Sequence, residues 1–182
     1  GTTQAVASAS LNNLMGLYEK ISVTGASDFS FEKSRYVRGA LSFLLHGEGT
    51  TATVSGNYSD TKPVEDAALN QTKGENKGFG VDISHPFMRS RAMNLRMNAG
   101  FDYKDSKTII TAPDNSLSDS KADFRSVNVG GTFDVADSTG GVTVLNVDGE
   151  LGLDIMDATK SVKATGTNKA FTNTFKKIEG SL

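Results

Sequence analysis

Apolar and polar residues alternate along much of this chain. From position 94 to position 104, every second residue is apolar or aromatic, and the residues between them are polar, charged or glycine. The apolar set is Leu95, Met97, Ala99, Phe101 and Tyr103. A period of two places successive side chains on opposite faces of a β-strand, whereas a helix would mix Arg96 and Asp102 with Leu95 on overlapping faces. The pattern therefore predicts a strand.

The same alternation recurs and predicts about eight strands. They are expected at residues 5–11, 21–25, 37–45, 51–59, 79–84, 94–104, 126–135 and 145–155. A ninth strand is expected to begin within residues 175–182, and no segment has the period of a helix. The predicted fold class is all-β, an antiparallel meander of about eight strands that forms part of a transmembrane β-barrel.

The connections between these strands alternate in length. Residues 12–17, 46–49, 86–92 and 136–140 are short turns, and residues 27–35, 60–77, 105–121 and 157–174 are long, polar loops. A meander with this layout has one end of short turns and one end of long loops. Outer-membrane barrels show this asymmetry, with short periplasmic turns and long external loops.

A soluble β-barrel or sandwich also alternates and also contains hairpins, so it is the main alternative. The loops of such a protein would not sort so regularly by length. The polar face here is rich in Ser, Thr, Asn, Asp and Arg, which suits a water-filled lumen. We therefore expect Leu95 and Met97 to face lipid and the polar face to line water. The lumen-lining candidates are Arg38, Asp82, Arg96, Asp102, Asp134, Asp148, Glu150 and Asp154.

Aromatic residues near the predicted strand ends agree with the girdles of a membrane barrel. They are Tyr18, Tyr58, Phe87, Phe101, Tyr103 and Phe133. The general preference of aromatic residues for strands is the simpler explanation of the same positions.

Composition narrows the functional classes. The length of 182 residues suits one domain, and 37% hydrophobic residues is too apolar for a disordered chain. No apolar run approaches the length of a transmembrane helix. The net charge of −2 argues against a nucleic-acid partner, and the absence of cysteine excludes disulfides and thiolate metal sites. With only 2 histidines, neither a metal site nor another cofactor is expected.

Two segments contain specific sequence motifs in addition to the alternation. Residues 11–21 read Leu-Asn-Asn-Leu-Met-Gly-Leu-Tyr-Glu-Lys-Ile. Residues 85–95 read His-Pro-Phe-Met-Arg-Ser-Arg-Ala-Met-Asn-Leu, and residues 100–107 read Gly-Phe-Asp-Tyr-Lys-Asp-Ser-Lys. In order and spacing, most of residues 1–157 resembles the barrel of the two-partner-secretion transporters, also called haemolysin activation/secretion proteins. The turn residues that match the family's motifs are Asn12, Asn13, Gly16, Pro86, Arg89 and Arg91.

The resemblance implies a transporter in the Gram-negative outer membrane. Such a transporter contacts membrane lipid and exports a large partner polypeptide, a haemolysin or adhesin, to the cell surface. The family combines a plug helix, two POTRA domains and a sixteen-stranded barrel with an inward loop that carries a Val-Arg-Gly-Tyr-like motif.

This chain departs from that plan in three ways. Nothing in it resembles a POTRA domain, Val37-Arg38-Gly39-Ala40 lacks the motif's aromatic residue, and the last residue, Leu182, is not the usual terminal Phe. We therefore expect residues 1–182 to be a partial outer-membrane β-barrel domain, its N-terminal part, cut from a longer protein. A complete eight-stranded barrel with a structural or adhesive role is the second hypothesis, and a soluble barrel that binds a small apolar ligand is the third.

Candidate chemistry is sparse. Asp148 and Glu150 share one face of a strand with their carboxylates roughly 7 Å apart, a separation also found in inverting glycosidases. A charged row that lines a wet lumen explains them better, because no other feature of an active site accompanies them. We expect no enzymatic activity. The basic residues Arg89, Arg91 and Arg96 are interpreted as a turn plus a lumen charge paired with Asp82 or Asp102, and lipid head groups or an anionic partner are the alternative ligands.

Overall fold

The computed structural model describes residues 4–28, 34–62, 71–111, 117–137, 139–156, 161–163, 170–172 and 175–181. The strands are β1 (Gln4–Asn12), β2 (Lys20–Asp28), β3 (Ser34–His46), β4 (Thr50–Thr61), β5 (Gln71–Arg89), β6 (Met93–Thr111), β7 (Leu117–Ala136), β8 (Val142–Gly152), β9 (Ser161–Lys163), β10 (Ala170–Thr172) and β11 (Lys176–Ser181). Within the described ranges, no helix has the length and apolar character needed to cross a bilayer.

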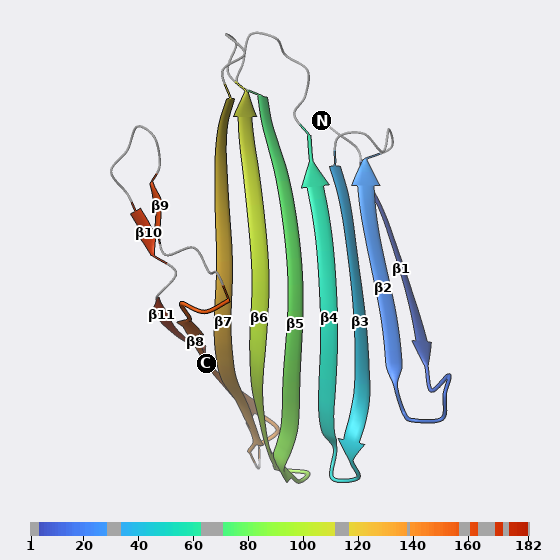
Figure 1. Cartoon of the computed structure of the whole chain (residues 1–182). Coiled ribbons are helices and arrows are strands. Elements are labelled where there is room, and N and C mark those ends of the chain that lie inside the picture. The colour runs from blue at the N-terminus through green and yellow to red at the C-terminus, as the bar shows by residue number, and fades with distance from the viewer. Residues whose placement is uncertain are drawn as a thin grey trace.

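A single antiparallel sheet of 9 strands dominates the structure, in the order β1-β2-β3-β4-β5-β6-β7-β8-β11 (Figure 1). Each strand pairs with the next along the chain until β8, which pairs with β11 after the small β9–β10 hairpin. The predicted meander and its ninth strand are therefore confirmed. Among the described residues, β1 pairs only with β2 and β11 pairs only with β8, so the sheet is an open arc.

The short turns gather at one end of the sheet, at the bottom of Figure 1, as the sequence predicts. They connect β1 to β2, β3 to β4, β5 to β6 and β7 to β8. The ends of β2, β4 and β6, which lead into the next three connections, lie at the opposite end. Residues 29–33, 63–70 and 112–116 of these connections lie outside the described residues, as does most of the predicted loop 157–174.

The central strands are longer than predicted. β6 continues to Thr111 and β7 begins at Leu117, so most of the predicted loop 105–121 is strand, and β5 begins at Gln71 inside the predicted loop 60–77. Both faces of these extensions are polar, so no alternation marks them. The backbone ladder nevertheless continues, with Thr111 opposite Leu117.

Two predicted boundaries are wrong at the short-turn end and in β8. The turn expected at 86–92 is shorter, because β5 continues through Pro86 to Arg89. Proline has no N–H to donate, and the pairing register shifts between Pro86 and Met88, which is a β-bulge. The strand expected to reach position 155 ends at Gly152, so Asp154 lies beyond β8.

The pairing register separates the side chains into two faces of opposite character. Met97, Gly131 and Val147 lie opposite one another on the apolar face, and Asn98 and Gly130 do so on the polar face. A Cβ atom built on Gly130 would lie 2.8 Å from Asn98 Oδ1, whereas the nearest atom to one built on Gly131 would be 3.9 Å away. Side chains therefore converge on the polar face and diverge on the apolar face, as expected when the polar face is concave.

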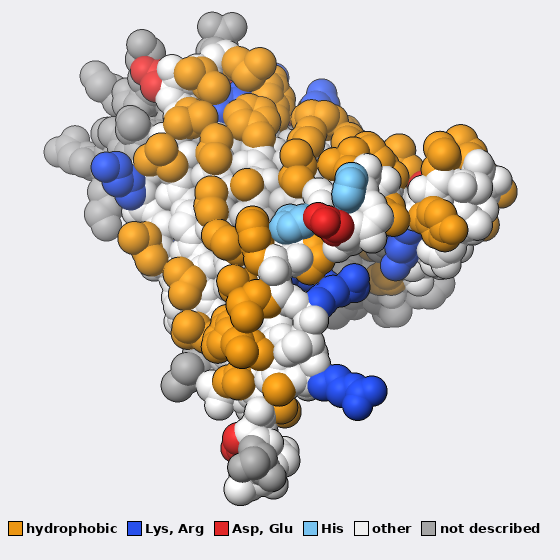
Figure 2. Space-filling view, turned by 90° about the horizontal axis from the view of Figure 1, so that it is seen from below, with side chains coloured by type: hydrophobic (Ala, Val, Ile, Leu, Met, Phe, Trp, Pro, Cys, Tyr) orange, Lys and Arg blue, Asp and Glu red, His pale blue; other side chains and the backbone are white. Residues whose placement is uncertain are grey.

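Seen from the short-turn end, hydrophobic side chains gather along one side of the sheet (Figure 2). Many are large and exposed, including Ile83 at 48%, Val129 at 51% and Val147 at 47%. From Leu95 to Tyr103 this apolar face spans eight residue-to-residue steps of β6, about 27 Å at roughly 3.4 Å per step. That length suits the apolar band of a membrane barrel, which is about 25 Å tall.

Candidate functional site

The concave polar face is the candidate functional surface of this chain. By register it carries seven of the eight lumen-lining candidates: Arg38 on β3, Asp82 on β5, Arg96 and Asp102 on β6, Asp134 on β7, and Asp148 and Glu150 on β8. The eighth, Asp154, follows the end of β8 and is exposed. The alternation thus located the charged residues of one face across several strands.

Hydrogen bonds between neighbouring strands hold this face together. Asn128 Nδ2 donates to Asp102 Oδ2 at 2.8 Å, and Asn94 Nδ2 donates to Asp134 Oδ2 at 2.7 Å. Ser126 Oγ donates to Glu150 Oε1 at 2.7 Å. Cross-strand pairs of this kind stabilise a sheet face and fix the rotamers of its side chains. The result is an ordered, hydrophilic wall.

Further polar pairs extend this wall at both ends of the face. Thr132 Oγ1 donates to Asn146 Oδ1 at 2.9 Å between β7 and β8. Ser106 Oγ donates to Asn76 Oδ1 at 2.7 Å between β6 and β5. On this face, cross-strand hydrogen bonds between serine, threonine and asparagine side chains hold neighbouring strands together, as apolar contacts do in the core of a soluble protein.

A hollow of about 360 Å³ lies at the short-turn end of the concave face. It is lined by Pro86, Met88, Arg89, Asn94, Leu95, Arg96, Thr132 and Asp134. The structure thus brings Arg89 and Arg96 of the predicted basic cluster together beside Asp134. Arg91 lies in the exposed turn after β5, outside this set.

The first motif segment forms the turn between β1 and β2. Asn13 and Gly16 have positive φ angles of 53° and 76°, and Asn13 Oδ1 accepts a hydrogen bond from the Tyr18 amide at 3.0 Å. The Glu19 carboxylate accepts hydrogen bonds from the amides of Met15 at 2.5 Å and Leu17 at 3.0 Å. Glu19 is only 2% exposed, and the Met15 amide in particular lowers its pKa. Asn12 ends β1 opposite Lys20.

The second motif segment forms the tight turn between β5 and β6. Ser90 closes it: its amide donates to the Met93 carbonyl at 3.0 Å, and its hydroxyl accepts from the Met93 amide at 2.9 Å. Arg89 is the last residue of β5 and lies opposite Asn94, whose Oδ1 accepts from the Ser90 amide at 3.2 Å. Pro86, at the bulge, lies opposite Arg96. Both motifs therefore define turn geometry.

The turn between β7 and β8 uses the same device. Asp137 Oδ1 accepts hydrogen bonds from the Thr139 hydroxyl at 2.7 Å and from the Gly141 amide at 2.8 Å. The Thr139 hydroxyl is the main reason why the pKa of Asp137 is lowered. A carboxylate at a turn thus organises a second hairpin at this end.

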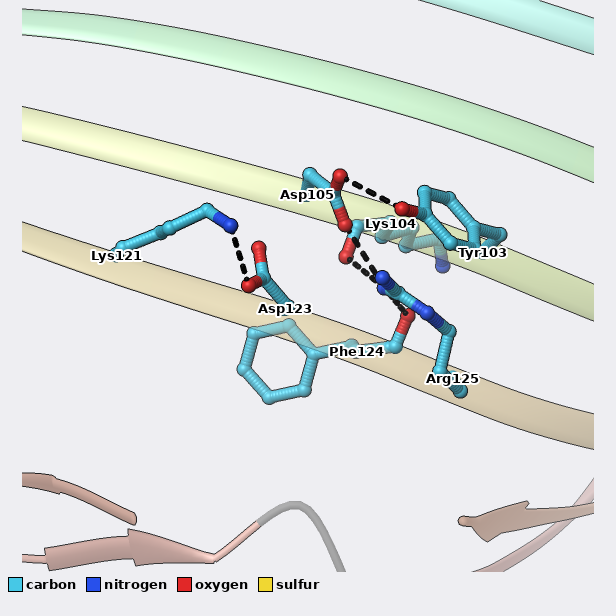
Figure 3. A network of polar contacts seen from close by, with 7 residues as sticks. All are labelled: Tyr103, Lys104, Asp105, Lys121, Asp123, Phe124 and Arg125. Atoms are coloured by element: carbon cyan, nitrogen blue, oxygen red, sulfur yellow. Dashed lines mark hydrogen bonds and ion pairs between the residues drawn. The ribbon is translucent and has the colours of Figure 1, made fainter. Parts of the chain in front are cut away.

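A charged cluster on the convex face was not found from the sequence (Figure 3). Arg125 Nη1 donates to Asp105 Oδ1 at 2.8 Å and to the carbonyl of Lys104 at 3.1 Å. Its guanidinium lies 3.3 Å from the centre of the Tyr103 ring, and its side chain is 2% exposed. Tyr103 donates to Asp105 at 3.0 Å. The expected loop over 105–121 concealed this cluster, whose sequence signal is charge at every second position on two paired strands.

Neither His85 nor the aromatic residue Tyr103 has surroundings that indicate a binding site of its own. His85 Nδ1 lies 2.7 Å from Thr50 Oγ1, and its ring meets Phe87 edge-on with 4.7 Å between the ring centres. Among the described residues, no group of His, Asp and Glu is arranged to hold a metal ion. Of the aromatic residues, Tyr103 lies within β6, where the apolar part of the convex face ends, and not at the end of the strand.

Comparison with known proteins agrees with this geometry. A family described as haemolysin secretion/activation protein ShlB/FhaC/HecB matches residues 1–182. CdiB from Escherichia coli is similar over 97% of this chain and 33% of its own, with a TM-score of 0.80 and 20% identity. BamA from Haemophilus ducreyi, in a crystal structure lacking POTRA domains 1–3, is similar over 83% of this chain and 31% of its own, with a TM-score of 0.51 and 13% identity. No curated protein matches the chain. The chain spans about a third of the length of each of these two structures.

Proposed function

Because the chain belongs to the ShlB/FhaC/HecB family of haemolysin secretion/activation proteins, we propose that it forms part of the wall of an export pore. The pore lies in the Gram-negative outer membrane and exports a large partner polypeptide, a haemolysin or adhesin, to the cell surface. Residues 1–182 supply a partial barrel domain, and further strands complete the ring.

The opposite chemistry of the two faces is the observation that supports this proposal most strongly. The convex face carries exposed apolar residues such as Met97, Val129 and Val147, and lipid is the solvent that makes such exposure favourable. The concave face carries a hydrogen-bonded polar wall, which needs water or a polar polypeptide in front of it. Lumen-facing positions that are polar and charged are typical of a wet barrel interior.

The eight-stranded alternative is not favoured. A spanning sheet must pair all of its backbone groups, because each unsatisfied group in lipid costs several kcal/mol. In the described residues the edges β1 and β11 are not joined, and the arc aligns with a third of CdiB. An arc that pairs with further strands meets this requirement.

We assign no catalytic role to Asp148 and Glu150. The Glu150 carboxylate accepts a hydrogen bond from Ser126 at 2.7 Å, and the Asp148 carboxylate lies over Gly130. Both belong to the wall of the concave face. Their charge sets the electrostatic character of the lumen, together with Arg38 and Arg96 on the same face.

Cysteine accessibility tests this function, because the chain itself contains no cysteine. Asp148→Cys and Val147→Cys are a matched pair of substitutions at neighbouring positions on opposite faces of β8. In the full-length protein, with any other cysteine replaced, a charged thiol reagent that does not enter membranes should modify the thiol at position 148. The same reagent should leave the thiol at position 147 unmodified.

Export of the partner polypeptide is the second readout of the same pair. A bulky adduct at position 148 should reduce the amount of partner that reaches the cell surface, whereas reagent should not change export by the variant at position 147. Equal modification of both positions would contradict the proposed orientation. Modification of position 148 without any effect on export would contradict the pore.

A further inference from the structure

The sheet extends beyond its apolar band on the convex face. Above Tyr103 and Phe79, which lie opposite each other, β5, β6 and β7 continue by up to eight residues. The outward-facing positions of these extensions carry the basic side chains Lys73, Lys77, Lys107 and Lys121, which we name the lysine belt. All four are exposed.

On these extensions, three of the four outward-facing acidic residues are covered more deeply than the lysines, and the fourth, Asp119 opposite Ile109, is exposed. The side chains of Lys77 and Lys121 are 61% and 65% exposed, whereas those of their ion-pair partners Glu75 and Asp123 are 34% and 8% exposed. Asp105, which is held by Arg125, is 27% exposed. Among the described residues of these extensions, four lysines and one carboxylate, that of Asp119, are exposed, so the charge offered to an approaching molecule is positive on balance.

Two lysines of the belt oppose each other directly. Lys107 on β6 faces Lys121 on β7 in the register. Like charges at directly opposite positions destabilise a sheet, because their Cβ atoms are only about 5 Å apart. Glu75 on β5 is the neighbour of Lys107 on its other side, but its carboxylate is bound 2.8 Å from Lys77 Nζ. Lys121 Nζ is bound 2.8 Å from Asp123, which compensates part of this repulsion, and an anion placed over Lys107 and Lys121 would relieve the rest.

The position of the lysine belt along the strands, just beyond the apolar band, indicates which molecule carries the anion. Tyr103 and Tyr58 mark the upper border of the apolar band, and Lys77 Nζ lies 5.9 Å from the centre of the Tyr58 ring. Aromatic residues at such a border lie at the level of the lipid head groups. Lys107 is four residues above Tyr103, roughly 13 Å along the strand. The belt is thus continuous with the lipid-facing surface.

We propose that the lysine belt binds the phosphate groups of phosphorylated glycolipid in the outer leaflet, with Lys107 and Lys121 as its centre. This inference rests on the proposed membrane orientation. Lipid phosphate, rather than free phosphate, is the ligand because its acyl chains cover the apolar residues directly below the same strands. Each lysine near a charged membrane surface contributes to such binding, and salt weakens it.

The test uses the full-length protein purified in detergent and bisphosphorylated lipid A as the probe. Lipid retained per protein is counted by native mass spectrometry. The variant Lys107→Gln/Lys121→Gln should lose affinity on the order of tenfold. The control Lys20→Gln/Lys104→Gln removes the same charge from the concave face and should bind like the unmodified protein.

Three further measurements distinguish binding of the lipid phosphate from binding of the acyl chains, binding of free phosphate and misfolding of the variant. Lipid A without its phosphates should bind equally to all variants, and inorganic phosphate should not displace the bisphosphorylated lipid. If the glutamine variant does not fold, Lys107→Arg/Lys121→Arg should fold and retain binding. Equal loss in belt and control variants, displacement by inorganic phosphate, or unchanged binding by the belt variant would overturn the proposal. Such a failure alongside normal thiol labelling of the Asp148→Cys variant would leave the proposed function standing, because that labelling reports the concave face alone.

Discussion

Single residues reveal the orientation of this sheet more clearly than its overall composition does. Met97 and Asn98 are adjacent on β6, and they face opposite sides. Replacing Met97 with Arg should destabilise the membrane-embedded protein by roughly 2–4 kcal/mol, since the new charge would lie in lipid near the middle of the bilayer. Asn98→Arg should cost little, because a charge on the polar face lies in water and not in lipid.

Urea titration of the protein folded into vesicles measures both of these free energies of unfolding. Equal costs at the two positions would contradict the assignment of the faces, and a greater cost for Asn98→Arg would reverse it.

Glu19 controls the first turn through its charge. Its folded-state pKa is lowered from 4.5, first by the Met15 amide, so its contribution to stability is present above the unfolded pKa. That contribution is lost as the pH falls below about 4.5 through the folded pKa. Hydrogen exchange at the Met15 and Leu17 amides, corrected for the intrinsic pH dependence, should therefore accelerate on acidification.

Glu19→Gln should show faster exchange at these two amides already at neutral pH, with no further acceleration in acid. As a control, amides in the β7–β8 turn should be unaffected by this substitution. Unchanged protection in the variant would show that the carboxylate does not hold the turn.

At the scale of the elements, the sequence predicted the strand segments that have one apolar face and missed the extensions, which are largely polar on both faces. The alternation of Leu95 to Tyr103 identified the centre of β6, because one face of this segment is apolar and the other is polar. It stopped at Lys104, since Asp105, Ser106 and Lys107 are polar on both faces. The ladder is continuous there, so alternation reports the environment of a strand and not its hydrogen bonding.

The candidate surface was predicted in the same way. Period two was enough to place Asp82, Asp102 and Asp148 on one face, because the register of a meander keeps equivalent positions together. The partners of these residues, such as Asn128 for Asp102, depend on the register between strands, which one sequence does not specify. The Arg125 cluster could not be predicted, because it depends on the pairing of β6 with β7 in a region that the sequence pattern assigned to a loop.

The extension of β6 beyond Lys104 predicts slow hydrogen exchange of its backbone amides. Amides of residues 105–111 should exchange slowly, as the ladder between β6 and β7 requires, and at rates closer to those of residues 95–103 than to those of the turn at 90–92. Hydrogen exchange with mass spectrometry on the protein in detergent measures this. Exchange as fast as that of the turn would show that this part of the chain is a loop, as the sequence pattern first indicated.

The two ends of the sheet should face different compartments. On intact cells, a thiol reagent that does not cross membranes should label Lys107→Cys, at the long-loop end. It should not label Arg91→Cys, in the short turn after β5, until the outer membrane is permeabilised. Labelling of position 91 alone on intact cells would reverse the topology.

At the scale of the whole molecule, the proposed pore depends on an arc that is completed by strands outside it. The concave curvature, the polar wall and the apolar outer band each fit a membrane barrel, and membership of the ShlB/FhaC/HecB family fits a secretion pore. A closed barrel made of these strands alone would have a narrow interior filled by side chains, unsuited to a polypeptide. Whether β1 meets β11 is therefore the decisive structural question.

Disulfide cross-linking between the two edges answers that question most directly. In the full-length, otherwise cysteine-free protein, Ile178→Cys on β11 is combined in turn with Ala5→Cys, Ala7→Cys and Ala9→Cys on β1. The positive control is Ala9→Cys with Val23→Cys, whose positions are directly opposite in the β1–β2 pair. If further strands complete the barrel, the control pair should cross-link on oxidation and none of the three β1–β11 pairs should do so within a monomer. Efficient cross-linking of β1 to β11 in a folded monomer would show a small closed barrel and would contradict the export pore.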